Sequence, residues 1–178
     1  MKTLTNPYEQ DQVRKVDPYS RLVAYPVQAQ NIFHFPEGVP AFEQVKEFVF
    51  LSKPDSRPFL FMQALRPQDL SFVCIDPFLI DPDYAPRISD ADAKFLHLNA
   101  VEDALVLCIV TVARDVTNTT ANLQAPLVIN INACMGKQII CDGQNYPVRY
   151  RIWDALDNIE TMQRENRASE QVEVSAKG

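Results

Sequence analysis

The sequence contains few glycines. Gly38, Gly136, Gly143 and Gly178 are the only four among 178 residues. The GxGxxG and GxxxxGK[ST] motifs need glycines at close, fixed spacings, because the backbone must approach a phosphate closely. The four positions supply neither spacing, so the sequence excludes both standard nucleotide-phosphate loops.

Long apolar runs are also absent. The longest mainly apolar stretch, Ala104 to Ala113, has ten residues, whereas a membrane-spanning helix needs about 20. The first residues, MKTLTNPYEQDQ, lack the apolar centre of a secretory signal peptide. We therefore expect a cytoplasmic protein that does not enter a membrane.

Cysteine and histidine do not form a familiar metal or catalytic motif. The four cysteines make no CxxC pair, and the two histidines make no HExxH. Cys74 and Cys108 lie in apolar runs, so we expect buried, unreactive thiols. His34 stands between two phenylalanines on a predicted strand, and Cys134 precedes a turn. These two residues are the remaining candidates for a reactive group.

An acidic cluster, Asp76, Asp81 and Asp83, lies in the string IDPFLIDPDY. Its oxygens would suit calcium, but the glycine and the terminal glutamate of an EF-hand loop are missing. Aspartates beside prolines also cap turns, which explains the same string without a metal. With His34 and Cys134, this cluster supports the alternative function, a small ligand- or metal-binding barrel or an enzyme of unknown substrate.

Acidic residues outnumber basic ones in the sequence. Seventeen basic and 23 acidic residues give a net charge of −6. Such a surface repels nucleic-acid phosphates and anionic lipids on average, and no run of Lys or Arg exceeds two residues. We therefore expect no direct nucleic-acid or membrane binding, and a basic protein is the better-matched partner.

The apolar pattern predicts an all-β fold. Strand-like segments recur at short intervals with little helical patterning between them, which favours a mainly antiparallel, small barrel-like or sandwich domain. The predicted strands are Asn31–Phe35, Glu47–Leu51, Phe59–Leu65, Leu70–Ile75, Ala104–Ala113, Leu127–Asn132, Lys137–Cys141 and Tyr146–Arg151. Ala104–Ala113 is apolar on both faces and is expected to be central.

Composition divides the chain into three parts. Residues 1–29 are predicted to be an N-terminal arm with an edge strand near Arg21–Val27, 30–153 the barrel-like domain, and 154–178 a C-terminal helix and polar tail. One short helix is predicted at Asp90–Phe95, with Ser89 as its N-cap. A second should begin near Asp154, because apolar residues recur every third position. These residues are Trp153, Leu156, Ile159 and Met162.

Several strings, in order, resemble the flagellar assembly factor family, FliW. They are FPEGVPAF (Phe35–Phe42), IDP (Ile75–Pro77) with PDY (Pro82–Tyr84), NLQAPLVIN (Asn122–Asn130), GKQII (Gly136–Ile140) and YPVR (Tyr146–Arg149). The resemblance covers Ile32 to Trp153. Ala41 stands where the family usually has a second glycine, and alanine disfavours positive φ, so we expect the backbone of this turn to differ slightly.

The resemblance implies a non-enzymatic cytoplasmic protein without cofactors, expected to be a monomer, that binds two proteins. One partner is flagellin, which such a factor binds in a chaperone-like manner, and the other is CsrA, a translational repressor. Flagellin that accumulates captures the factor, which leaves CsrA free to repress flagellin translation. After flagellin export, the free factor binds CsrA and relieves the repression.

Candidate interface residues lie in these strings or in the predicted loop between Pro77 and Asp81. The partner-binding candidates are Phe42, Asp76, Phe78, Leu79, Tyr84, Asn122 and Asn130, and the turn-shaping residues are Gly38, Pro40, Pro77 and Pro126. The aromatic and aliphatic candidates are expected to be exposed in turns, and the run Phe78-Leu79-Ile80 either packs inward or meets a partner. The two asparagines either cap the ends of a strand or face a partner.

Overall fold

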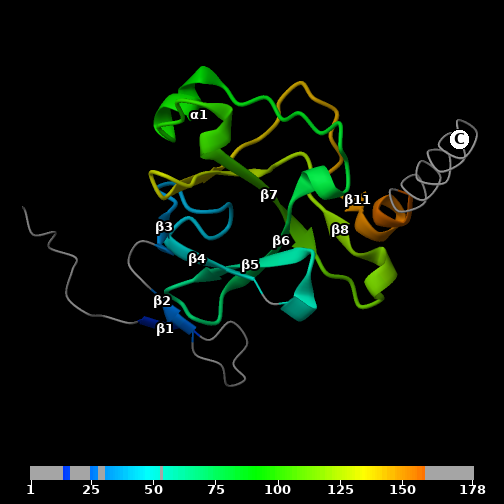
Figure 1. Cartoon of the computed structure of the whole chain (residues 1–178), viewed down its shortest axis with the longest axis horizontal. Coiled ribbons are helices and arrows are strands. Elements are labelled where there is room, and N and C mark those ends of the chain that lie inside the picture. The colour runs from blue at the N-terminus through cyan, green and yellow to red at the C-terminus, as the bar shows by residue number, and fades with distance from the viewer. Residues whose placement is uncertain (1–13, 17–24, 28–30, 53, 159–178) are drawn as a thin grey trace, which may run out of the picture.

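The computed structural model describes residues 14–16, 25–27, 31–52 and 54–158. Its strands form a two-stranded sheet and a nine-stranded sheet (Figure 1). The strands are β1 (Arg14–Val16), β2 (Tyr25–Val27), β3 (Phe33–His34), β4 (Glu47–Ser52), β5 (Phe59–Ala64), β6 (Ser71–Ile75), β7 (Ala104–Thr111), β8 (Thr120–Ala121), β9 (Leu127–Asn130), β10 (Met135–Gln138) and β11 (Tyr150–Arg151).

The larger sheet closes into a seven-stranded barrel. Its order is β11-β8-β7-β6-β5-β4-β3-β10-β9, and β9 pairs back with β7. All pairs are antiparallel except β3 with β10, which is parallel through Met135 and His34. Closure gives each of the seven barrel strands two neighbours, which reduces the free strand edges that otherwise invite association. The expected all-β, mainly antiparallel, barrel-like fold is confirmed.

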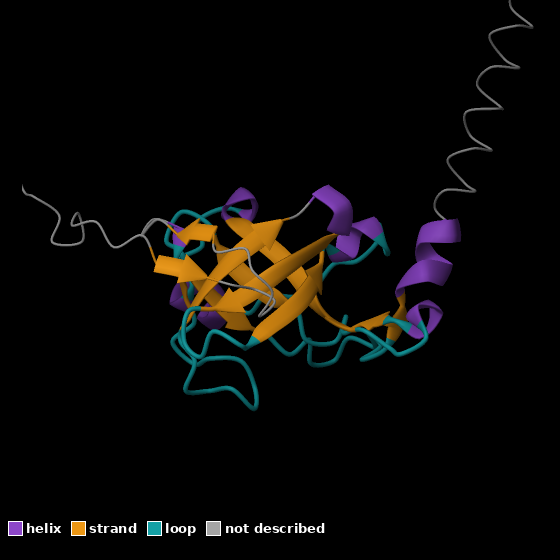
Figure 2. Ribbon diagram, turned by 90° about the horizontal axis from the view of Figure 1, so that it is seen from below, coloured by secondary structure: helices purple, strands orange, loops and turns teal. Residues whose placement is uncertain are grey.

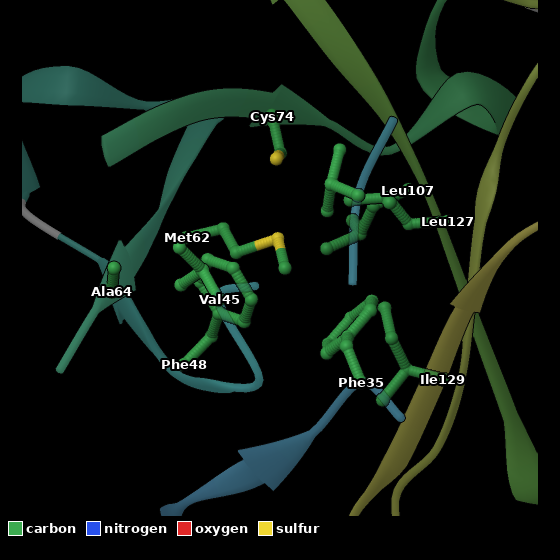
Figure 3. Close-up of a cluster of buried hydrophobic side chains, with 10 residues drawn as sticks. Phe35, Val45, Phe48, Met62, Ala64, Cys74, Leu107, Leu127 and Ile129 are labelled. Carbon is green, nitrogen blue, oxygen red and sulfur yellow. The ribbon is translucent and has the colours of Figure 1, made fainter. Parts of the chain in front are cut away.

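The barrel interior is filled by apolar side chains from its strands and from the segment between β3 and β4 (Figure 3). Phe35 and Phe48 meet edge to face, with their ring centroids 5.3 Å apart. Gly136 on β10 makes room for Phe35, because a Cβ on Gly136 would lie 2.2 Å from the Phe35 Cζ. A strand glycine at this place marks such a close approach.

Strand β7 is apolar on both faces, as predicted, because it is packed on both sides. Leu105, Leu107 and Ile109 belong to the interior cluster. Cys108 and Val110 belong to a second cluster outside the barrel, with Ile80, Tyr84 and Ile152 among its buried members. Figure 2 shows the strands at the centre of the molecule, with the helices and loops around them.

Helix α1 (Asp90–Phe95) has the predicted bounds and the predicted N-cap. The Ser89 Oγ accepts a hydrogen bond of 3.1 Å from the Asp92 backbone N–H. Residues 152–158 are also helical, so the second helix begins two residues before the expected Asp154. The indole of Trp153 donates to the Val116 carbonyl at 2.8 Å. Short 3-10 helices also lie in the described residues, among them η2 (Pro54–Ser56), η3 (Pro77–Leu79), η4 (Val101–Asp103) and η5 (Val116–Asn118).

Five predicted strands agree with β4, β5, β6, β7 and β9 to within two residues at each end. The predicted Asn31–Phe35 and Tyr146–Arg151 shorten to β3 and β11. The bounds of the predicted Lys137–Cys141 strand are wrong, because β10 begins at Met135 and ends at Gln138. The glycine at position 136 is typical of a turn, but here it lies within the strand. Strand β8 was not predicted, since two residues carry no period. In the predicted Arg21–Val27 strand, Tyr25–Val27 forms β2, while most of the arm and the tail beyond 158 lie outside the described residues.

We expect Gly136→Ala to lower the free energy of unfolding by about 1–3 kcal/mol, the usual cost of overpacking a core. The added Cβ has no space beside the Phe35 ring. Urea denaturation measures the change. Gly143→Ala is the matched control: its Cβ would meet nothing within 4 Å, but its φ of 74° should still cost about 1 kcal/mol. If Phe35→Leu does not reduce the loss caused by Gly136→Ala, the steric explanation is wrong.

Candidate partner-binding site

The connection between β6 and β7, residues 76–103, carries most of the predicted site residues. It begins with η3, where the Asp76 Oδ1 accepts a hydrogen bond of 2.9 Å from the Phe78 N–H. Pro77 is buried in the first turn of η3. The short helix turns Phe78 and Leu79 outward, with 46% and 44% of their surface exposed, while Ile80 is buried. Two of the three apolar residues in this run therefore face solvent.

An apolar pocket of about 520 Å³ opens beside Phe78. Segments from η3, residues 84–88, α1, the turn after α1, η4 and the beginning of β7 form its walls. The lining residues are Phe78, Tyr84, Ala85, Pro86, Ile88, Ala93, Leu98, Asn99, Ala100, Val101, Ala104 and Val106. Its volume falls in the range of about 300–1,000 Å³ that is common for binding sites.

Tyr84 forms part of the pocket wall but is not exposed. Only 3% of its surface is accessible, and its hydroxyl donates a hydrogen bond of 2.7 Å to the Leu123 carbonyl. Burial raises the pKa of Tyr84 well above its usual value. The expectation of an exposed Tyr84 is therefore wrong, because an anchor distant in sequence draws the side chain inward. Its ring still packs edge to face against Phe78, with centroids 6.0 Å apart.

The pocket walls are held by three side chains from other parts of the chain. Gln144 donates to the Ala85 carbonyl at 2.9 Å and accepts from the Arg87 N–H at 2.7 Å. Asn130 donates to the carbonyls of Leu96 and His97, each at 2.9 Å. Lys137 contacts Asp92 on α1 at 2.9 Å. The pocket is thus fixed by the fold before any partner arrives.

The two asparagine candidates have internal partners. In addition to its two donated bonds, the Asn130 Oδ1 accepts from the N–H groups of Asn132 and Ala133, each at 2.9 Å. The Asn122 Oδ1 accepts from the Ala125 N–H at 3.2 Å. These bonds correspond to the structural alternative, in which the asparagines cap the ends of a strand.

Phe42 also lies away from the pocket. It is half-buried and packs edge to face against Phe72, with ring centroids 5.3 Å apart, at the border of the interior cluster. The turn before it contains Gly38 at φ 74° and Ala41 at φ 71°. Ala41 therefore adopts the left-handed backbone conformation that glycine adopts more readily. A Cβ on Gly38 would lie 2.6 Å from the Glu43 Cα, so this turn has no room for a side chain at position 38.

The prolines differ in exposure. Pro40 is exposed in the Gly38–Phe42 turn, whereas Pro126 is buried beside β9. The Pro126 carbonyl accepts a hydrogen bond of 2.9 Å from the Ile139 N–H, which extends the β9–β10 pairing. Both positions lie outside the strands, so neither removes a ladder donor.

Turn-capping aspartates and buried thiols are prominent among the residues that could serve metal or nucleophilic chemistry. No cluster of three His, Cys, Asp or Glu side chains suited to a metal occurs in the described residues. The Asp81 Oδ1 accepts from the Asp83 N–H at 3.2 Å, as expected of turn-capping aspartates. Burial raises the pKa values of Cys74 and Cys108 to about 12, in agreement with the predicted unreactive thiols. His34 is exposed on β3.

Comparison with known proteins decides the family. The family model described as FliW protein matches residues 19–152. The chain belongs to the FliW family. It is 41% identical over 132 residues to the flagellar assembly factor FliW of Caldicellulosiruptor saccharolyticus, covering 74% of this chain and 86% of that one. The corresponding protein of Caldicellulosiruptor bescii is 40% identical over 134 residues, covering 75% and 88%.

A solved FliW structure supports the fold as well. The crystal structure of a flagellar assembly factor FliW superposes with a TM-score of 0.71 at 33% identity, covering 76% of this chain and 95% of that one. FliW is a family of regulatory assembly factors. The matched residues 19–152 include the whole pocket and all the resembling strings. Among the described residues, none of the helices has the length and hydropathy required for a membrane span.

The sequence did not indicate several pocket residues. Val101, in η4, is 86% exposed, and Leu98 and Ala93 complete the walls with it. These three residues lie in α1, in the turn after it and in η4, and they share no sequence periodicity that would have predicted one common surface. The one available signal was Val101 itself, an apolar residue between Ala100 and Glu102 in a polar loop.

Lys137 links α1 to the Gly38 turn. Its Nζ lies 2.9 Å from Asp92 Oδ1, 3.2 Å from Glu37 Oε2 and 5.0 Å from the centroid of the Phe95 ring. Hydrogen bonding to Asp92 raises the pKa of Lys137. Two hydrogen bonds lower the pKa of Asp92; the one from the Ser89 hydroxyl has the larger effect and the one from Lys137 the smaller. This cluster fixes the position of α1 and hence of one pocket wall.

We expect Lys137→Met to lower the free energy of unfolding at pH 7 by about 1 kcal/mol, the upper range for partly exposed ion pairs. A lowered folded pKa means that Asp92 stabilises the fold above its unfolded pKa, and that this stability is lost as pH falls through the folded value. The deficit should therefore shrink below about pH 4. Urea denaturation at several pH values, with the exposed Lys94→Met as control, checks this. A deficit that is constant down to pH 2 would argue against the pair.

Proposed function

We propose that this protein binds flagellin and antagonises the translational repressor CsrA in the cytoplasm, without catalysing a reaction. The supporting observation is the outward presentation of Phe78 and Leu79 beside an apolar pocket on a FliW-family barrel. Apolar side chains that stay half-exposed in a loop contribute less to stability than buried ones, because much of their surface still faces water. Exposed aromatic residues next to a pocket are typical anchors of protein interfaces.

The proposed mechanism is an exchange between two binding equilibria. Flagellin that accumulates occupies the protein, and CsrA is then free to repress flagellin translation. When flagellin is exported, the vacated protein binds CsrA, and translation resumes. Such sensing depends on relative concentrations and affinities and needs no bond to be made or broken.

The groups near the pocket support binding rather than chemistry. Burial raises the pKa values of Tyr84 and Cys108 above their usual values, so both remain protonated at neutral pH. The Tyr84 hydroxyl is engaged by the Leu123 carbonyl. Neither group is therefore poised as a base or nucleophile, which would need a pKa near the working pH.

A small apolar ligand is the second candidate. The volume of about 520 Å³ and the apolar lining would suit such a molecule. Mass spectrometry of compounds released from the purified protein, with metal analysis, tests this alternative. Co-purification with endogenous proteins tests the proposed function, and recovery of a stoichiometric small molecule without either protein partner would favour the alternative.

Phe78→Ala should weaken flagellin binding by about 1–3 kcal/mol, as truncation of an aromatic anchor does. The fold should tolerate this change, because 46% of the Phe78 surface is already exposed. Val112→Ala is the control, since Val112 is 58% exposed and is not part of the pocket lining. Calorimetric titration with flagellin measures the affinity, and thermal melting checks the fold. Equal flagellin affinity in folded Phe78→Ala and wild type would remove η3 from the interface.

CsrA association should slow as salt rises, because an RNA-binding repressor presents a basic surface and screening shortens electrostatic steering. Residues 30–153 contain fourteen acidic and ten basic residues, a net charge of −4. Stopped-flow measurement across a salt series gives the rates. Association rates that do not depend on salt would contradict an acidic docking face for CsrA.

A further inference from the structure

Only one aspartate of the chain is followed by glycine. The residues before the four glycines are Glu37, Met135, Asp142 and Lys177, so no asparagine precedes a glycine either. An aspartyl residue rearranges most readily before glycine, because the missing Cβ leaves the next backbone nitrogen open to the side-chain carboxyl. Asp142-Gly143 is therefore the one place in the sequence where this rearrangement of the main chain is strongly favoured.

This pair forms the exposed tip of a turn between β10 and β11. The Gln144 N–H donates to the Cys141 carbonyl at 3.2 Å, so Asp142 and Gly143 are the two central residues of a β-turn, and both are exposed. A Cβ on Gly143, whose φ is 74°, would meet nothing within 4 Å. Neither the Asp142 carboxylate nor the Gly143 N–H forms a hydrogen bond with a described residue. The two groups that must react are therefore accessible and unengaged.

The residues just after this tip hold one wall of the pocket. Gln144 donates to the Ala85 carbonyl at 2.9 Å and accepts from the Arg87 N–H at 2.7 Å. The Tyr146 hydroxyl accepts from the Ala85 N–H at 3.0 Å. The positions of both side chains depend on the length and direction of the main chain through the turn, so a change in the turn is passed on to this wall.

We propose that Asp142 converts to isoaspartate and that the conversion loosens the pocket wall at Ala85 and Arg87. The Gly143 nitrogen attacks the Asp142 Cγ, and one carboxyl oxygen leaves as water with the amide proton and a proton from solvent. Water then adds to the original backbone carbonyl of the succinimide ring, and the bond from this carbonyl to the Gly143 nitrogen breaks. One water leaves and one enters, so the mass is unchanged and no oxidant or cofactor is needed.

The product differs from the original turn in two ways. The main chain now runs through the Asp142 Cγ and is longer by one methylene, and the former backbone carbonyl is a free carboxylate. The extra atom displaces Gln144, and hydrogen bonds as short as those to Ala85 and Arg87 weaken quickly when they are stretched or bent. The new carboxylate is exposed to methyltransferases that esterify isoaspartyl groups with S-adenosylmethionine.

The chemical step is tested by ageing the full-length protein in oxygen-18 water at neutral pH. Trypsin releases the fragment 138–149, and mass spectrometry locates isoaspartate and the oxygen-18 that ring hydrolysis introduces. Methyl transfer by a recombinant isoaspartyl methyltransferase gives an independent measurement. We expect isoaspartate at Asp142 at a rate within about tenfold of that in a synthetic peptide of the same sequence, because the tip is exposed.

Two controls test the specificity of this reaction. Asp142→Glu keeps the charge but would have to form a less favourable six-membered ring, so it should yield no isoaspartate at this position. Asp55, which is also exposed but precedes serine, is the internal reference. It should isomerise more slowly than Asp142, because the serine side chain hinders approach to the backbone nitrogen.

Hydrogen exchange tests the loosening of the wall. In the isomerised fraction, the Arg87 amide should exchange at least about fivefold faster than in fresh protein, because it loses its acceptor on Gln144. The Ala100 N–H donates to the Asp103 carboxylate on another wall at 3.1 Å, and its exchange should stay within about twofold. Gln144→Ala in fresh protein should reproduce the faster exchange at Arg87. Thermal melting checks that each sample remains folded.

Each outcome supports or overturns the proposal. Aged wild-type protein without isoaspartate at Asp142, or with a rate more than about tenfold below that of the peptide, would overturn the modification site. Isoaspartate found instead at Asn145, with the higher mass that deamidation gives, would also overturn it. Unchanged exchange at Arg87, either in the isomerised protein or in Gln144→Ala, would overturn the link between this turn and the pocket wall.

Discussion

The pairing of β7 is the constraint on which the rest of the structure depends. One edge of β7 pairs with β6, while the other edge is divided between β9 near its beginning and β8 near its end. The pairing with β9 closes the barrel, and the pairing with β8 extends the sheet toward β11. Because Leu107 faces the interior cluster and Cys108 the outer one, β7 must be apolar on both faces. A charge at either position would be buried without a partner, which is strongly destabilising.

The candidate site is formed by the long connection that joins β6 to β7. Antiparallel neighbours such as β6 and β7 can be joined by a two-residue turn, yet here they are joined by residues 76–103. Long connections on a rigid scaffold commonly carry function. This one packs Ile80 and Tyr84 against the outside of the barrel and leaves Phe78 and Val101 in solvent. The barrel supplies the rigid support, and the connection supplies the surface.

The sequence predicted the features that depend on local chemistry. The Ser89 cap could be predicted because a hydroxyl just before a helix bonds to the first turn of that same helix. The β7 strand could be predicted because its run of apolar residues is continuous in the sequence. Features that depend on distant contacts could not. The buried Tyr84 hydroxyl donates to a carbonyl 39 residues away in the sequence. Gly136 near the start of β10 leaves room for the Phe35 ring, which is also distant in the sequence. The pocket itself joins segments with no common period, so only Phe78 and Tyr84 among its lining residues were predicted as site residues.

The rigidity of the connection bears on how two partners could exchange on one small protein. Gln144, Asn130 and Lys137 fix its path from three other parts of the chain. A surface that is already ordered loses little conformational entropy when it binds, so the ordering cost falls on the partner. A helical partner segment that is disordered when free would then bind with moderate affinity and leave readily. Two partners that both dock on this connection would need the same space and would therefore exclude each other. Partner exchange on this connection would thus follow from shared space and would need no change in the shape of the barrel.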